Sequence, residues 1–197
     1  MNNGSLSFWR KLKGFLGAPV DTFNAVGPET LGSALKFFAI WAVVYAVLQT
    51  IFFYVLGMGI FQALWEWLGL GPVVVYDFNP VAFGLVSLVG AFGGLFIIGS
   101  WAHIFVRAFG GRKGYKNTIK AFAYGNTPAL MLGWIPYVGW LFSIWALVLD
   151  IIGVRQLHQI STGRAVGAVL VSIAVLAVIV VLIVLGVVLT AVLHATA

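Results

Sequence analysis

Residues 165–193, AVGAVLVSIAVLAVIVVLIVLGVVLTAVL, contain no charged residue and consist almost entirely of valine, leucine, isoleucine and alanine. A helix rises about 1.5 Å per residue, and about 20 consecutive apolar residues are enough to cross the hydrocarbon core of a bilayer. This stretch exceeds that length. It therefore predicts a membrane-spanning helix.

The composition of the rest of the chain agrees with this prediction. The chain has 197 residues, of which 62% are hydrophobic and only 8% are charged. A soluble domain carries about 25% charged residues, so a soluble or disordered protein is excluded. Cysteine is lacking, which excludes a disulfide-built scaffold, thiol catalysis and thiolate metal sites. We expect an all-α integral membrane helical bundle.

Apolar runs separated by polar residues, glycine and proline predict five membrane passes. They are residues 37–56, 81–106, 121–134, 137–153 and 165–193. The third and fourth passes are short, with a turn at Ile135-Pro136-Tyr137, so 121–153 either crosses twice as a bent hairpin or enters and returns. Residues 57–80 predict a short interfacial helix. The domains are a cytoplasmic segment, 1–32, and a membrane domain, 33–197.

The positions of lysine and arginine favour five passes. In that arrangement residues 1–36, 107–120 and 154–164 share one side and contain all eleven basic residues. Merging 121–149 into a single pass would leave nine basic residues on one side of the membrane and two on the other. The positive-inside rule then places the N-terminus in the cytoplasm and the C-terminus outside, and we expect the cytoplasmic membrane of a prokaryote. The basic residues are thereby explained without nucleic acid, and the expected partners are anionic lipid headgroups at the cytoplasmic face.

The N-terminal segment SLSFWRKLKGFLG, residues 5–17, places apolar residues at helical spacing among three cations. It predicts an amphipathic interfacial helix with Arg10, Lys11 and Lys13 directed toward phospholipid headgroups. The alternative is a solvated terminus whose charges serve only insertion.

Two ionisable side chains lie within predicted passes. His103 is a candidate proton relay or ligand, but it lies four residues before Arg107 and could simply reach the headgroups. Asp150 is expected to lie near the interface or to pair with Arg155, Arg107 or Arg164, because an unpaired carboxylate is costly in the bilayer. A role in transport is the alternative for Asp150.

Tyr124, Asn126, Thr127 and Pro128 form a polar cluster inside the third pass. Pro128 removes a helix hydrogen bond, and the neighbouring polar side chains can satisfy the freed carbonyl. The cluster is therefore either a self-satisfied kink or a small notch that binds a lipid headgroup or a partner helix.

Gly90 and Gly94 form a GxxxG step in the second pass. Such a step permits close helix approach, either within the chain or in self-association.

No Ser/His/Asp or Cys/His triad, phosphate-binding loop or metal-ligand set can be assembled from the sequence. We therefore expect no enzyme, no cofactor and no metal site.

Residues 121–165 resemble the Yip1 domain family in its compact prokaryotic form. The resemblance rests on Tyr124 with Pro128, Ile135-Pro136, Gly139-Trp140, Gly153, His158, residues 161–165, and Gly93-Gly94 through His103 to Gly110-Gly111. It covers roughly 81–195 and, more loosely, 19–56. The resemblance implies a five-pass bundle with a cytoplasmic N-terminus and supplies no catalytic residue. Eukaryotic relatives act in vesicle trafficking with prenylated Rab-type GTPases, but this chain lacks their long cytoplasmic N-terminal region.

The expected function is a non-enzymatic membrane protein that organises lipids or protein partners within the bilayer. The alternative is a small transporter or channel subunit that uses the Tyr124–Pro128 notch with His103 and Asp150.

Overall fold

A computed structural model describes residues 6–54, 63, 65–69, 79–135 and 138–196. Within these ranges the regular structure is entirely helical, which confirms the all-α prediction. The main helices are α1 (Phe8–Gly17), α2 (Pro19–Val26), α3 (Leu31–Phe52), α5 (Pro80–Ala108), α6 (Tyr115–Gly125), α7 (Thr127–Leu132), α8 (Gly139–His158) and α9 (Thr162–Thr196).

Local sequence signals explain where the long helices begin and end. The side chain of Thr30 caps α3 by accepting a hydrogen bond from the Ser33 amide at 3.2 Å. The side chain of Asn79 caps α5 by accepting a hydrogen bond from the Val81 amide at 2.9 Å. Pro80 occupies the first helical position of α5. Gln159 ends α8 in the left-handed conformation, with φ of 55°.

Four helices are long and apolar enough to cross a membrane: α3, α5, α8 and α9. They correspond to the predicted first, second, fourth and fifth passes. The first begins six residues before the predicted boundary, at Leu31, and the fourth extends five residues beyond it, to His158.

The predicted third pass, 121–134, is not one continuous helix. In its place α6 begins at Tyr115 and ends at Gly125, and the short α7 follows after a break at Asn126. The break between α7 and α8 falls at the predicted turn, although residues 136–137 lie outside the described part of the chain. The structure thus supports four spanning helices and a broken segment, and the fifth crossing stays a prediction. Most of the interfacial helix predicted in 57–80 also lies outside the described residues.

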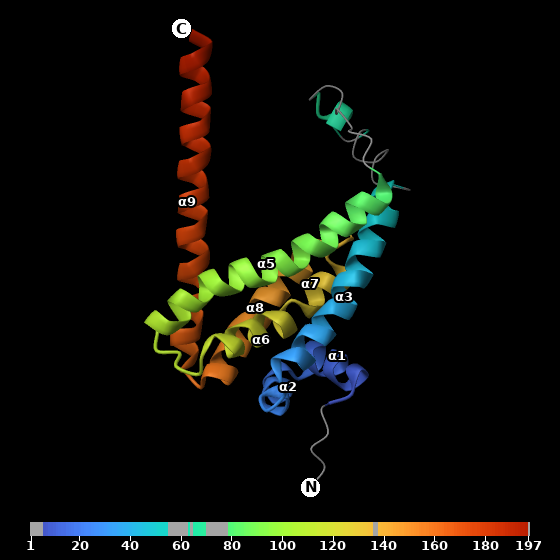
Figure 1. Cartoon of the computed structure of the whole chain (residues 1–197), viewed down its shortest axis with the longest axis vertical. Helices are drawn as coiled ribbons and strands as arrows, with labels where there is room; N and C mark the ends of the chain where they lie inside the picture. The colour runs from blue at the N-terminus through green and yellow to red at the C-terminus, as the bar shows by residue number, and fades with distance from the viewer. Residues whose placement is uncertain (1–5, 55–62, 64, 70–78, 136–137, 197) are drawn as a thin grey trace.

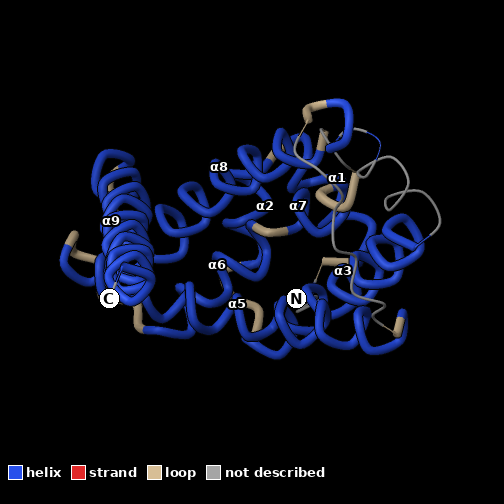
Figure 2. The backbone as a smooth tube through the Cα atoms, turned by 90° about the horizontal axis from the view of Figure 1, so that it is seen from above, coloured by secondary structure: helices blue, strands red, loops and turns tan. Residues whose placement is uncertain are grey.

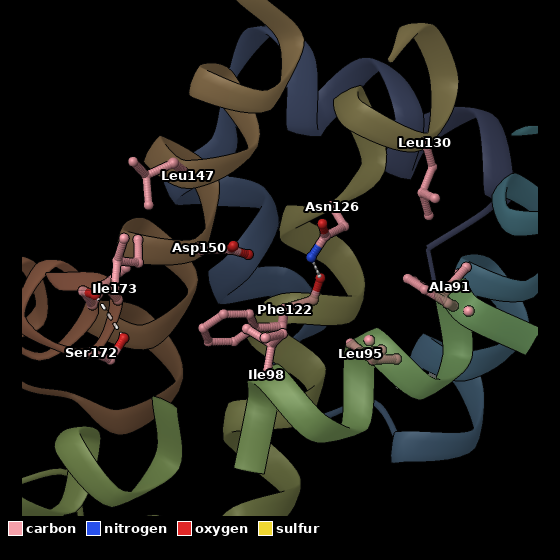
Figure 3. Close-up of a pocket in the computed structure, with 14 residues that line it drawn as sticks. Ala91, Leu95, Ile98, Phe122, Asn126, Leu130, Leu147, Asp150, Ser172 and Ile173 are labelled. Atoms are coloured by element: carbon pink, nitrogen blue, oxygen red, sulfur yellow. Dashed lines mark hydrogen bonds between the residues drawn. The ribbon is translucent and has the colours of Figure 1, made fainter. Parts of the chain in front are cut away.

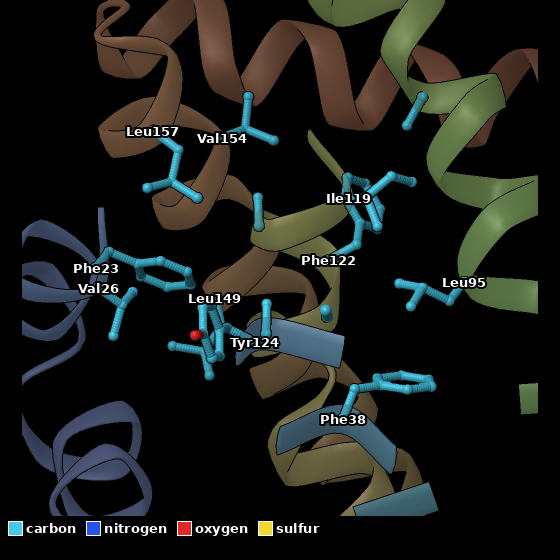
Figure 4. Close-up of a cluster of buried hydrophobic side chains, with 14 of the residues drawn as sticks. Phe23, Val26, Phe38, Leu95, Ile119, Phe122, Tyr124, Leu149, Val154 and Leu157 are labelled. Carbon is cyan, nitrogen blue, oxygen red and sulfur yellow. The ribbon is translucent and has the colours of Figure 1, made fainter. Parts of the chain in front are cut away.

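Helix α6 occupies the middle of the bundle. It packs most extensively against α8 and also contacts α3 and α5, and Figure 2 shows it enclosed by its neighbours. In contrast, α9 stands at one edge and extends away from the other helices (Figure 1). The core that results joins the N-terminal helices to the bundle through buried side chains such as Phe23, Tyr124 and Leu149 (Figure 4).

Glycine permits the closest helix contacts. A Cβ atom added to Gly153 of α8 would lie 2.8 Å from the ring of Phe23 and 3.0 Å from Cβ of Ala121, so α2, α6 and α8 meet at this residue. At Gly90 and Gly94, however, an added Cβ would meet no described atom within 4 Å. The GxxxG step therefore mediates no close packing among the described residues, and self-association through it stays a prediction.

Candidate functional site

The carboxylate of Glu29 is the centre of a hydrogen-bond network between the N-terminal helices and the bundle. It accepts hydrogen bonds from Nζ of Lys11 at 2.5 Å, Oγ of Ser33 at 2.6 Å and the hydroxyl of Tyr124 at 2.8 Å. The backbone amide of Leu6 donates a further bond at 3.0 Å. The side chains of the Lys11–Glu29 ion pair are only 6% and 7% exposed, so four parts of the chain are fixed at one nearly dry point.

Lys120 of α6 also binds the segment that contains Glu29. Its Nζ donates to the backbone carbonyls of Gly27 and Glu29, both at 2.6 Å. Burial lowers the pKa of the Lys120 ammonium, and the charge of Glu29 partly offsets this effect. Burial alone would raise the pKa of the Glu29 carboxyl, but hydrogen bonds from Lys11, Ser33 and Tyr124 and the Lys11 charge lower it below its usual value. The network therefore holds Glu29 ionised.

The three cations predicted to face lipid headgroups do not share one environment. Arg10 and Lys13 are exposed on α1, beside Trp9, whose side chain is 66% exposed. Lys11 is instead buried and paired with Glu29. The helical spacing explains this division, because Lys11 and Phe15 are four residues apart and face the core, whereas Trp9 and Lys13 share the outer face.

The polar groups around Pro128 satisfy the helix break itself. Because proline lacks an N–H group, the carbonyl of Tyr124 has no helical donor, and Oγ1 of Thr127 donates to it at 2.5 Å. The side-chain amide of Asn126 donates to the Phe122 carbonyl at 2.8 Å. The Tyr124 ring is buried and stacks on Phe15 with 5.1 Å between centroids. The structure therefore contains the self-satisfied kink, and Asn126 also lines a cavity.

His103 has partners that its place in the sequence did not indicate. Its Nδ1 lies 2.7 Å from Oγ1 of Thr118, and the same oxygen lies 2.9 Å from Nε2 of His158. One threonine hydroxyl thus links the histidines of α5 and α8 at the end of the bundle where α6 begins. The described residues include no group of three histidine, cysteine or acidic side chains arranged to hold a metal ion.

Of the two arrangements expected for Asp150, pairing with an arginine does not occur among the described residues, and a position near the interface stays a prediction. Asp150 is 8% exposed, its Oδ1 has no hydrogen-bond partner, and no ion pair to it occurs among the described residues. The reason is geometric, since α8 presents Asp150 to α6, where an added Cβ on Gly125 would lie only 2.0 Å from Oδ1. The glycine gives the carboxylate room against the α6 backbone.

Asp150 also lines a cavity of about 310 Å³ formed where α3 and α5–α9 converge. Figure 3 shows the carboxylate pointing from α8 toward Asn126, with Ser172 of α9 on another wall. The remaining lining is mostly apolar and includes Gly90, Leu95 and Phe122.

Several residues of these sites were not among the sequence-based candidates: Glu29, Lys120, Thr118, His158 and Ser172. Glu29 and Lys120 lie in segments that were interpreted only as topology signals. The contacts that join Glu29 and Lys120 to distant segments span 91–95 residues, so no local spacing could indicate them. The signal available for Glu29 was local: it lies four residues before Ser33, to which it bonds, and it is one of only two acids in residues 1–36.

Four spanning helices, a broken helix between them and a basic polar end define the class as a multi-pass integral membrane protein. The Yip1 domain family matches residues 13–185, most of the chain, and the protein belongs to that family. This confirms the resemblance found in the sequence. No curated protein and no solved structure matches the chain. The Yip1 family is in general one of non-enzymatic membrane proteins.

Proposed function

We propose that this protein is a non-enzymatic organiser of the bilayer that gathers anionic lipids around its basic end. The observation that carries the proposal is the exposure of most of its cations. Eight of the eleven lysine and arginine residues are exposed: Arg10, Lys13, Lys36, Arg107, Arg112, Lys113, Lys116 and Arg164. They belong to α1, the start of α3, the end of α5, the α5–α6 connection, the start of α6 and the start of α9, and these segments lie toward one end of the molecule in Figure 1.

Helix α1 supplies the lipid-facing part of this end. Phe15 and the Lys11–Glu29 pair fix the helix to the bundle, so Trp9, Arg10 and Lys13 are held in place on its outer face. An aromatic ring beside cations is the side-chain combination that suits the headgroup region. A cation near an anionic membrane surface contributes about 1 kcal/mol to attraction.

Replacing Arg10 and Lys13 together by glutamine should reduce the enrichment of phosphatidylglycerol around the protein severalfold, because two surface cations are lost. The protein is reconstituted into nanodiscs with equal phosphatidylglycerol and phosphatidylcholine, and the lipids that remain bound after mild extraction are quantified by mass spectrometry. The enrichment should also weaken as salt rises. The charge-preserving pair Arg10→Lys with Lys13→Arg is the matched control and should retain it. Equal enrichment in the glutamine variant and wild type would refute the proposal.

We also infer that the basic end faces the cytoplasm of a prokaryotic cell, with five crossings in all. The positive-inside rule supports this orientation. Because the chain has no cysteine, single cysteines can report it directly. Lys113→Cys and Gln159→Cys should react with an impermeant thiol reagent only from the cytoplasmic side, and His194→Cys only from outside. Reaction of Gln159→Cys from outside would contradict the five-pass topology.

The transporter alternative gains no support from His103 or from the polar residues beside Pro128. His103 bonds to Thr118, and the side chains of Asn126 and Thr127 donate to backbone carbonyls of their own segment.

A further inference from the structure

The carboxyl group of Asp150 is buried without a compensating partner. Asp150 is only 8% exposed, Oδ1 has no hydrogen-bond partner, and the residue belongs to a helix that is long and apolar enough to cross the membrane. Phe38, near the start of α3, lines the same cavity, so the carboxylate lies inside the bundle toward its basic end. A buried charge without a partner is expensive and usually marks a functional site.

The helix opposite Asp150 is interrupted at the same depth. Helix α6 spans 11 residues, about 16 Å, from the basic end to its break at Asn126. A helix that ends inside a bundle directs the negative end of its dipole into the protein, and broken helices of this kind form cation sites in membrane proteins. Side chains of Asn126 and Thr127 already bond the carbonyls at this break, so the groups that remain for a cation are the side-chain oxygens at the cavity. The observation that points to a ligand is the unpartnered carboxylate in that cavity.

The polar groups that line the cavity are oxygen donors suited to a small cation. Asp150 offers a carboxylate, Ser172 a hydroxyl oxygen, and Asn126 an amide oxygen, because its nitrogen is engaged with Phe122. Hard cations prefer such oxygen ligands. No lysine, arginine or histidine lines the cavity, and Asp150 is the only acid that does. A single negative charge matches a monovalent cation rather than a divalent one.

We propose that Asp150, together with Asn126 at the α6–α7 break and Ser172 of α9, binds a small monovalent metal cation such as Na⁺ in this cavity. Asp150 is the charged ligand, and the cation compensates the carboxylate that no residue of the described chain neutralises. This site is independent of the lipid-binding end, and it assigns cation binding rather than transport.

The first test is the effect of salt on the thermal stability of the full chain in nanodiscs of phosphatidylcholine and phosphatidylglycerol. A ligand that binds only the folded state raises the Tm in a saturable manner. We expect NaCl to raise the wild-type Tm by about 5 °C above choline chloride of equal ionic strength, since choline is too large for the site. Asp150→Asn should abolish the difference, and Asn126→Ala should weaken it. Asp21→Asn, which changes an exposed acid of α2, should leave it unchanged.

The second test uses a hydrophobic carbodiimide, which adds to protonated carboxyl groups within the membrane. A bound cation displaces the proton, so Na⁺ should slow modification of Asp150 in a concentration-dependent manner, and mass spectrometry of the peptide would measure it. A wild-type response to Na⁺, K⁺ or Li⁺ in either test, lost in Asp150→Asn, supports the site. No response beyond that of choline in both tests, or a response that persists in Asp150→Asn, overturns it.

Discussion

Replacing Glu29 by glutamine should lower the free energy of unfolding by about 3 kcal/mol, because the substitution leaves the buried ammonium of Lys11 without its counter-charge. In a chain of this length, that loss corresponds to a fall in Tm of about 10 °C. The Tm is measured by tryptophan fluorescence in detergent micelles. The double variant Lys11→Met with Glu29→Gln should recover part of the loss, since no unpaired charge remains.

The control for this prediction is Asp21→Asn, which removes an exposed acid from the adjacent helix and should change the Tm little. A Glu29→Gln protein as stable as wild type would show that the network does not hold the N-terminal helices in place.

The same network predicts how acid affects stability. Since the pKa of Glu29 is lower in the folded chain than in the unfolded chain, its contribution is complete above the unfolded-state pKa. That contribution is lost as the pH falls through the lower folded-state pKa. The wild-type Tm should therefore decrease more steeply in acid than the Tm of Glu29→Gln.

The second large effect is expected at Gly125. Changing Gly125 to alanine should lower the free energy of unfolding by about 2 kcal/mol. The new Cβ would lie 2.0 Å from Oδ1 of Asp150 and 3.0 Å from the Asp150 backbone nitrogen. The carboxylate can rotate away, but the backbone contact requires α8 to move. Thermal unfolding in micelles measures the loss.

Gly93→Ala is the matched control for Gly125, since an added Cβ there meets no described atom within 4 Å. It should be neutral or stabilising by up to about 1 kcal/mol, through helix propensity. Combining Gly125→Ala with Asp150→Ala should restore the part of the loss that the carboxylate causes. Equal stability of the Gly125 and Gly93 variants would contradict the close packing of α6 on α8.

Hydropathy predicted the spanning helices because their signal is local. The runs that became α5 and α9 have no charged residue over their central lengths, and lipid solvation alone makes them helical. The bounds of the third segment were predicted less well, for a physical reason. Lys120 appeared to belong to a solvated loop, but it lies within α6, where two carbonyls of a distant segment solvate its ammonium.

The candidate sites were predicted less well than the helices. The sequence singled out Tyr124, His103 and Asp150 as unusual polar residues within apolar runs. It could not supply their neighbours, because Tyr124 meets Glu29 across 95 residues, and Thr118 meets His158 across 40. These contacts depend on how α6 packs, which follows from tertiary structure rather than from periodicity.

Because α9 stands apart from the other helices, lipid rather than protein surrounds most of it. The apolar part of this helix, Thr162–His194, is about 50 Å long, whereas the hydrocarbon core is about 30 Å thick. From Ala177 to His194 every residue is exposed, whereas the first part of the helix packs on α5 and α8. A span longer than the hydrocarbon core must tilt or protrude, and the neighbouring helices restrain only its first part. Ser172 and Ile173 belong to that packed part and form one wall of the Asp150 cavity, so the same helix joins the cavity to the surrounding lipid.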